Sequence, residues 1–169
     1  TFESLGYPAG KEYYIRLHMN GEYLGLFAVL EQPDSRFLDR SRLNRNGNLY
    51  KAVAAREEHF NESNVRSGYE KKTNENDDFS DLVAFLNQLH TTPGPELVEW
   101  FSRRVDEDRM IDYQVGQILI ANTDYFHKNH YLYHDTATGR WMPLLWDLDL
   151  TFGKSWSATD GGVLHDRLR

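Results

Sequence analysis

Alternating apolar and polar positions over residues 11–32 predict a β-hairpin near the start of the chain. Its first strand, residues 14–19, places apolar side chains on one face and polar ones on the other. Asn20-Gly21 supplies the two positive-φ positions of a type I′ turn. The return strand, residues 22–30, is apolar on both faces, which predicts that both faces are covered. Gly25 interrupts this strand and indicates either a packing bulge or a close approach of the backbone to a ligand.

A short helix is predicted directly after the hairpin. Glu31 ends the hairpin as a carboxylate, and Pro33 opens a sequence typical of a helix start. Phe37 and Leu38 are the packing residues of this helix. Its charged side chains, Arg40 among them, are predicted to form a solvated face.

Residues 49–53 predict a second strand, and Lys51 lies in the middle of it among apolar neighbours. A lysine in this setting is either a charge on an edge strand, with its ammonium extended to solvent, or a cation that binds phosphate. The sequence leaves both interpretations open. The polar residues 56–76 then predict an irregular excursion, with a lid or a substrate loop as its function. We expect Lys71 and Lys72 in it to be solvated.

Three helical patterns occupy residues 77–122. Asp77-Asp78 can cap the first helix, and Asp106 can cap the third. The third helix is predicted to be deeply buried and to lead the chain to Asp124. One face of this helix consists of Ile111, Val115, Ile118 and Asn122, widened by Leu119, Ile120 and Ala121.

Two acid-containing segments flank a second predicted hairpin, residues 130–146. Asp124 and Asn129 precede it with the spacing D-x-x-x-x-N, and Asp147 and Asp149 follow it within W-D-x-D. Phosphoryl transfer requires a carboxylate that orients the attacking hydroxyl, oxygen ligands for Mg²⁺ and a cation on the phosphates. The strand lysine, the buried helix and these two segments resemble protein kinases in the order in which they occur along the chain.

Composition narrows the possible partners. The chain has 169 residues, enough for one domain with a sizeable core. Its formal net charge of −7 argues against nucleic-acid binding and suits a basic protein partner. Cysteine is absent, and no apolar run approaches the roughly 18 residues of a membrane span. Because the chain lacks an initiator methionine and ends abruptly, we expect a core that is truncated at both ends.

Three other interpretations compete with a phosphoryl-transfer site. Asp and Asn side chains commonly form local hydrogen bonds in turns, which would make the acidic segments purely structural. A zinc site built from Asp124 and histidines is disfavoured, because His130 and His134 on one strand would lie about 13 Å apart. A non-catalytic binding module would instead use exposed aromatic residues such as Trp141 or Trp156.

The ordered set of segments resembles the CotH family, the atypical protein kinases of the spore-coat type. The usual kinase motifs H-R-D, D-F-G and G-x-G-x-x-G are absent. The resemblance covers nearly the whole chain and is most specific in its last two segments. The matching segments are residues 20–27 with Glu31, residues 47–51, residues 69–72, residues 122–129 and residues 146–153.

The resemblance implies an α+β, atypical protein-kinase-like fold in a single domain over residues 1–169. An N-terminal antiparallel β-rich part (residues 1–54) would precede a mainly helical part (residues 77–169) that carries the catalytic loop and a metal-binding hairpin. It also implies ATP- and Mg²⁺- or Mn²⁺-dependent phosphorylation of Ser or Thr in a Lys/Arg-rich protein. The implied location is the spore coat, or a secreted or cell-envelope setting.

The resemblance also assigns roles to individual residues. Asp124 is the expected catalytic acid/base, and Lys51 is the expected catalytic and phosphate-binding lysine. Glu31 is a weaker candidate for the nucleotide site, where it could hold Lys51. The expected metal ligands are Asn129, Asp147 and, in reserve, Asp149.

Overall fold

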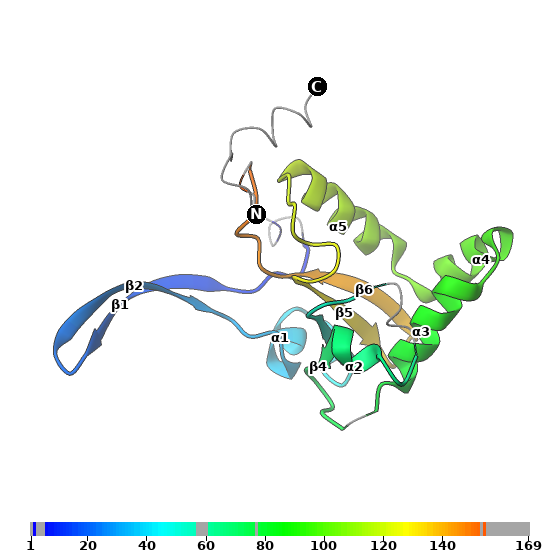
Figure 1. The fold of residues 1–169 in the computed structure, drawn as a ribbon, viewed down its shortest axis with the longest axis horizontal. Helices are drawn as coiled ribbons and strands as arrows, with labels where there is room; N and C mark the ends of the chain where they lie inside the picture. The colour runs from blue at the N-terminus through cyan, green and yellow to red at the C-terminus, as the bar shows by residue number, and fades with distance from the viewer. Residues whose placement is uncertain (1, 3–5, 57–60, 77, 153, 155–169) are drawn as a thin grey trace.

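The computed structural model describes residues 2, 6–56, 61–76, 78–152 and 154 (Figure 1). This part of the chain forms an antiparallel α+β structure with a projecting hairpin and a four-stranded sheet. The predicted helix cap Asp77, residue 153 of the last matching segment and the candidate recognition residue Trp156 lie outside it. In chain order the elements are β1 (Glu12–Met19), β2 (Glu22–Leu30), α1 (Ser35–Arg40), β3 (Asn48–Ala52), α2 (Val65–Gly68), β4 (Tyr69–Lys71), α3 (Ser80–Thr91), α4 (Gly94–Arg104), α5 (Glu107–Leu119), β5 (His130–Asp135) and β6 (Arg140–Leu145).

The four-stranded sheet has the order β4-β3-β5-β6, and every neighbouring pair is antiparallel. The sheet therefore joins β3, from the part expected to be β-rich, to the predicted second hairpin, β5–β6. Pairing between distant segments has no local signature in the sequence. Pro143 lies on the edge strand β6, where its missing N–H is tolerated.

Both faces of this sheet are buried, because successive side chains on a strand point to opposite faces. On β3, Leu49 belongs to one hydrophobic cluster and Tyr50 to the other. The Leu49 cluster includes Phe37 and Leu38 of α1, as the sequence predicted. The Tyr50 cluster includes Leu82 and other residues of α3.

A network of side-chain hydrogen bonds attaches α3 to the sheet. The carboxylate of Asp81, in the first turn of α3, accepts hydrogen bonds from Tyr50 (2.5 Å) and from Asn48 (2.7 Å). It also contacts Nδ1 of His134 at 2.6 Å. The His134 ring stacks on Trp141 with a centroid distance of 4.3 Å. Trp141 is only 4% exposed, so its predicted use as a recognition residue is wrong.

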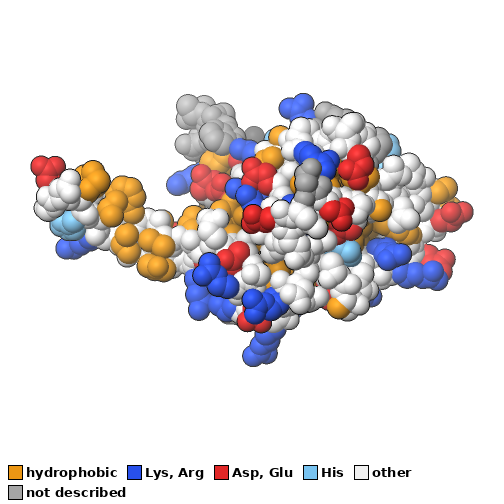
Figure 2. Space-filling model, turned by 90° about the horizontal axis from the view of Figure 1, so that it is seen from below, with side chains coloured by type: hydrophobic (Ala, Val, Ile, Leu, Met, Phe, Trp, Pro, Cys, Tyr) orange, Lys and Arg blue, Asp and Glu red, His pale blue; other side chains and the backbone are white. Residues whose placement is uncertain are grey.

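The β1–β2 hairpin forms as predicted but lies apart from the sheet. Asn20 (φ 52°) and Gly21 (φ 87°) form its turn, and a register shift between Leu17 and His18 lies opposite Gly25. The prediction that both faces of the return strand are covered is wrong among the described residues. Figure 2 shows hydrophobic side chains along the projecting hairpin. The exposed ones are Tyr13, Tyr14, Met19, Tyr23, Leu24, Leu26, Phe27 and Leu30.

The apolar face of α5 is also exposed, contrary to prediction. The helix begins after the predicted cap, Asp106, whose side chain accepts a hydrogen bond from the N–H of Arg109. Its buried residues are Tyr113, Gly116 and Gln117, whereas Ile111, Val115, Ile118 and Leu119 are exposed. Gly116 makes this orientation possible, because a Cβ there would lie 2.2 Å from the Phe2 ring. Close packing at a glycine therefore outweighs the apolar stripe.

Three further expectations need correction. The segment 56–76, predicted to be irregular, contains α2 and the edge strand β4. Lys71 in β4 donates a hydrogen bond to the carbonyl of Asp78 (2.5 Å) and is not simply solvated. Arg40, assigned to a solvated face, forms an ion pair with Glu31. Within the described ranges, no helix has the length and apolar character needed to cross a membrane.

We expect Asp81→Ala to lower the free energy of unfolding by about 1–3 kcal/mol at pH 7, because buried hydrogen-bond partners lose their acceptor. Burial raises the pKa of Asp81, but hydrogen bonds from His134, Tyr50 and Asn48 outweigh it and lower the pKa. A lowered pKa stabilises the fold above the ordinary carboxyl value of about 4, and this contribution disappears as the pH falls toward the folded-state pKa.

Urea denaturation at several pH values measures this effect. The difference between wild type and Asp81→Ala should narrow as the pH falls below about 4. Asp39→Ala, at an exposed position of α1, is the matched control and should change stability by less than about 0.5 kcal/mol. If the difference in unfolding free energy between wild type and Asp81→Ala stayed constant with pH, the ionised carboxylate of Asp81 would not be the source of the stabilisation.

Candidate active site

A buried polar turn holds Asp124 in place after α5 ends. Asn122 is fully buried, and its side chain forms two hydrogen bonds. Its amide nitrogen donates to Oε1 of Gln117 at 2.9 Å. Its Oδ1 accepts the backbone N–H of Asp124, also at 2.9 Å. The sequence analysis placed Asn122 on the apolar face of a helix, but its function in the structure is to fix the backbone of Asp124.

The two acid-containing segments lie side by side, as their order in the sequence predicted. The backbone N–H of Thr123 donates to the carbonyl of Leu150 at 3.4 Å. The N–H of Phe152 donates to the carbonyl of Ile120 at 2.7 Å. These bonds join the chain before Asp124 to the chain after Asp149.

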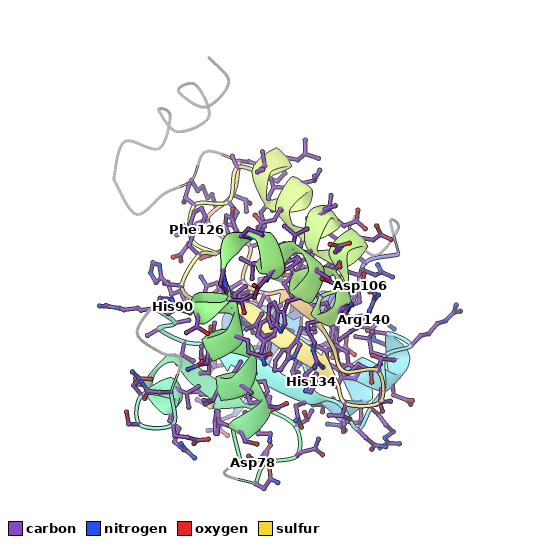
Figure 3. The ribbon with its side chains drawn as sticks, turned by 90° about the vertical axis from the view of Figure 1, so that its right-hand side faces the viewer. Asp78, His90, Asp106, Phe126, His134 and Arg140 are labelled. Carbon is purple, nitrogen blue, oxygen red and sulfur yellow. The ribbon has the colours of Figure 1, made fainter. Side chains whose placement is uncertain are left out.

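Asp124 is the centre of a compact set of polar groups. It is 6% exposed. Its Oδ2 accepts a hydrogen bond from Nδ2 of Asn129 at 2.8 Å and forms an ion pair with Nζ of Lys128 at 3.1 Å. The acid and the amide of the D-x-x-x-x-N segment are therefore in direct contact. Phe126, between them in the sequence, is exposed (Figure 3). Its ring stacks on that of Tyr125.

Asp147 lies in a region of excess negative charge. Burial raises its pKa first of all, and the negative charges of Asp149 and Asp124 raise it further. The positive charge of Lys128 lowers it. Asp147 and Asn129 both have positive φ, 54° and 60°. Asp and Asn tolerate this conformation better than other residues with a side chain.

Lys51 lies on an interior strand, because β3 has β4 on one side and β5 on the other. The edge-strand explanation for this lysine is therefore excluded. Its Nζ lies 5.5 Å from the centre of the Trp146 ring, a cation–π contact with the residue that precedes Asp147. The structure thus brings Lys51 to the W-D-x-D segment.

Glu31 contacts a different cation from the one expected. Its carboxylate accepts two hydrogen bonds from Arg40, at 2.9 and 2.6 Å, and one from the backbone N–H of Lys11 at 3.0 Å. Burial raises the pKa of Glu31, but these bonds outweigh it and hold the pKa below its ordinary value. This ion pair connects the base of the hairpin to α1. The expected partner, Lys51, lies against Trp146 instead.

The donor atoms of this region fit Mg²⁺ or Mn²⁺ bound together with phosphates. Mg²⁺ is commonly held by one or two carboxylates, and phosphate oxygens and water complete its octahedron. Asp147 and Asp149 supply carboxylates, and Asn129 retains its amide oxygen because its nitrogen bonds to Asp124. Across the described ranges, no three His, Cys, Asp or Glu side chains gather into a metal-binding group of their own. The site would therefore depend on nucleotide phosphates for its remaining ligands.

The histidines considered for a zinc site have separate partners. Nδ1 of His130 faces the carbonyls of Tyr125 (3.0 Å) and Lys128 (3.2 Å), inside the 124–129 loop. His134 binds Asp81 in the network under α3. The His130 ring thus shapes the loop that carries Asp124.

Sequence reasoning missed two residues of this site. Gln117 is fully buried and bonds to Asn122, but a glutamine within a helical pattern gives no local signal of this role. Lys128 was detectable, because a basic residue four positions after an acid can reach it when the intervening loop folds back. Only the structure shows that this loop does so, with Lys128 on Asp124.

Comparisons with known proteins agree with the order of the segments. The family model described as "CotH kinase protein" matches residues 1–167. The inner spore coat protein H of Bacillus subtilis (strain 168) is 27% identical over 161 residues. This alignment covers 90% of the chain and 44% of the relative. The chain therefore spans less than half the length of this relative.

We expect Asn122→Ala to destabilise the protein by about 1–3 kcal/mol, because the substitution leaves buried groups of Gln117 and Asp124 without partners. Urea denaturation measures the loss. Asn87→Ala, at an exposed position of α3, is the control and should stay within about 0.5 kcal/mol of wild type. Equal stability of the two variants would show that the buried turn does not depend on Asn122.

Proposed function

Since this chain belongs to the CotH kinase protein family, we propose that it transfers the terminal phosphoryl group of ATP to a Ser or Thr hydroxyl of a protein. The observation that carries the proposal is the contact of Asp124 with Asn129, beside the segment of Asp147. A carboxylate, an amide and two further carboxylates at one place supply the groups that phosphoryl transfer needs. The proposal includes a kinase-like arrangement of the fold around this site.

Each residue has a defined task in the proposed reaction. Asp124 accepts the proton of the acceptor hydroxyl, whose oxygen bonds to the terminal phosphorus while the bond to the bridging oxygen breaks. ADP leaves with that electron pair. Asn129 orients Asp124 through the 2.8 Å hydrogen bond. Lys51 would hold the nucleotide phosphates, and the amide oxygen of Asn129 with the carboxylates of Asp147 and Asp149 would hold a Mg²⁺ or Mn²⁺ ion, which would neutralise charge on the phosphates.

The surroundings of Asp124 suit this task. A buried carboxylate with fixed hydrogen bonds presents its oxygen in one orientation, so that little reorganisation is needed at the moment of transfer. The buried Asn122 turn supplies that rigidity from behind.

The partner that we propose is a basic protein of the spore coat. The relative in Bacillus subtilis is an inner spore coat protein. The formal charge of −7 would attract a Lys/Arg-rich substrate and speed its association. Nucleic acid, which carries the same sign of charge, is a poor partner.

We expect ATP with Mg²⁺ or Mn²⁺ to raise the melting temperature of the protein. A ligand at about 100 times its Kd stabilises the folded state by about 2.7 kcal/mol. For a domain of this size, that corresponds to a rise of roughly 5–10 °C. Asp147→Asn should lose most of the rise, because a carboxylate ligand is replaced by a neutral amide. Asp149→Asn should lose less.

Thermal-shift measurements with ATP on wild type and the two variants, with and without metal, test this prediction. The nucleotide-free melting temperatures are the control for folding. If neither metal produces a shift in wild type, the kinase proposal fails, and a non-catalytic binding module of the same family takes its place. If Asp149→Asn loses more of the shift than Asp147→Asn, the two acids have exchanged roles.

We expect Asp124→Asn to retain nucleotide binding but to lower the rate of phosphate transfer by about 100-fold or more, the usual contribution of a general base. Transfer of radiolabelled phosphate to a basic protein measures the rate, and calorimetry measures binding. Asp108→Asn, on an exposed part of α5, removes the same charge and should leave both unchanged. A parallel loss of binding and transfer in Asp124→Asn would show that Asp124 binds the nucleotide instead.

A further inference from the structure

Lys128 lies at the boundary between the buried acid and solvent. Its Nζ is 3.1 Å from Oδ2 of Asp124. The Lys128 side chain is 33% exposed, whereas that of Asp124 is 7% exposed. The ammonium group therefore covers the carboxylate on its solvent side.

The charges around Lys128 indicate why a cation is needed there. The negative charges of Asp124 and Asp149 act on Asp147, and Lys128 acts on Asp147 and forms an ion pair with Asp124. Nucleotide phosphates would add further negative charge to this acidic region. Any anion that approaches needs a cation that can contact it directly.

Lys51 and Lys128 both carry a positive charge, but they lie in different places relative to the acids. The Lys51 ammonium lies over the Trp146 ring, 5.5 Å from its centre. Lys128 is bound directly to the carboxylate that we propose as the base. A lysine has a flexible four-carbon stem, so its ammonium can move a few ångströms without a change in the backbone.

We propose that Lys128 is a catalytic residue that contacts the terminal phosphate of ATP. This inference rests on the proposed function and adds a residue that the sequence analysis did not assign. Without nucleotide, Lys128 neutralises Asp124. With nucleotide, its ammonium turns to the oxygens of the terminal phosphate and stabilises their charge during transfer. Lys128 keeps its proton throughout, and the hydroxyl proton goes to Asp124.

The position of Lys128 makes its effect specific to one phosphate. The acceptor hydroxyl must meet Asp124 and the terminal phosphorus together, so a cation on Asp124 lies beside the terminal phosphate and not beside the other two. ADP lacks that phosphate. Lys128 should therefore matter for ATP binding and much less for ADP binding.

Calorimetric titration of ATP and ADP, each with Mg²⁺, tests the inference on four variants. Lys128→Met removes the charge at similar length, and Lys128→Gln retains a hydrogen-bond donor toward Asp124. Lys128→Arg keeps the charge. Arg103→Met is the matched control, since it removes one positive charge from an exposed ion pair on α4. Melting temperatures without nucleotide report folding.

We expect Lys128→Met and Lys128→Gln to weaken ATP binding by about 10-fold or more, the range for a hydrogen bond to a charged group. ADP binding should change less than about twofold in both variants. Lys128→Arg should lie close to wild type, and Arg103→Met should match wild type for both nucleotides.

Two results would overturn the inference while leaving the proposed function intact. Equal weakening of ATP and ADP would make Lys128 a residue that only positions the loop. Unchanged ATP affinity in Lys128→Met would show that the ammonium does not contact the phosphate. If wild type binds neither nucleotide, the proposed function fails and the inference fails with it.

Discussion

The antiparallel pairing of β3 with β5 is the interaction on which the arrangement of the site depends. Lys51 lies opposite Tyr131 in this pairing, so a residue from the first third of the chain meets a strand that begins directly after Asn129. β6 then returns beside β5 and leads the chain into the W-D-x-D segment. Three segments that lie far apart in the sequence are thereby brought to the same end of one sheet. If β3 slipped by one residue, Lys51 would point to the opposite face.

The carboxylates of the site repel one another, and other interactions of the fold must offset this repulsion. Three carboxylates near one another disfavour the ionised state of Asp147, and a native structure keeps such a group only where other interactions compensate. Compensation comes from the ion pair of Lys128 with Asp124 and from the buried bonds of Asn122. The acidic end of the sheet therefore depends on this ion pair and these hydrogen bonds.

The sequence revealed local features better than exposure or long-range partners. The hairpin turn at Asn20-Gly21 and the helix cap at Asp106 follow from short-range chemistry, and both were predicted correctly. The uncovered faces of the hairpin and of α5 were not, because hydrophobicity shows what should be buried but not whether a partner is present. The spacing of Asp124 and Asn129 predicted two residues of one site, but their direct hydrogen bond was not predicted. The ion pair of Glu31 with Arg40 was missed, because charge pairing across an irregular connection has no sequence period.

The positive φ values of Asn129 and Asp147 bear on how relatives of this protein should be compared. At these two positions the backbone itself selects Asn, Asp or Gly, whether or not a metal ever binds. Under the proposed function, a relative that no longer transferred phosphate could keep both residues for the geometry of its turns. Asp124 and Lys128 do not have positive φ, so the backbone gives no such reason to keep them. Loss of the residues equivalent to Asp124 and Lys128, with those equivalent to Asn129 and Asp147 retained, would then mark a relative that lacks the proposed transfer.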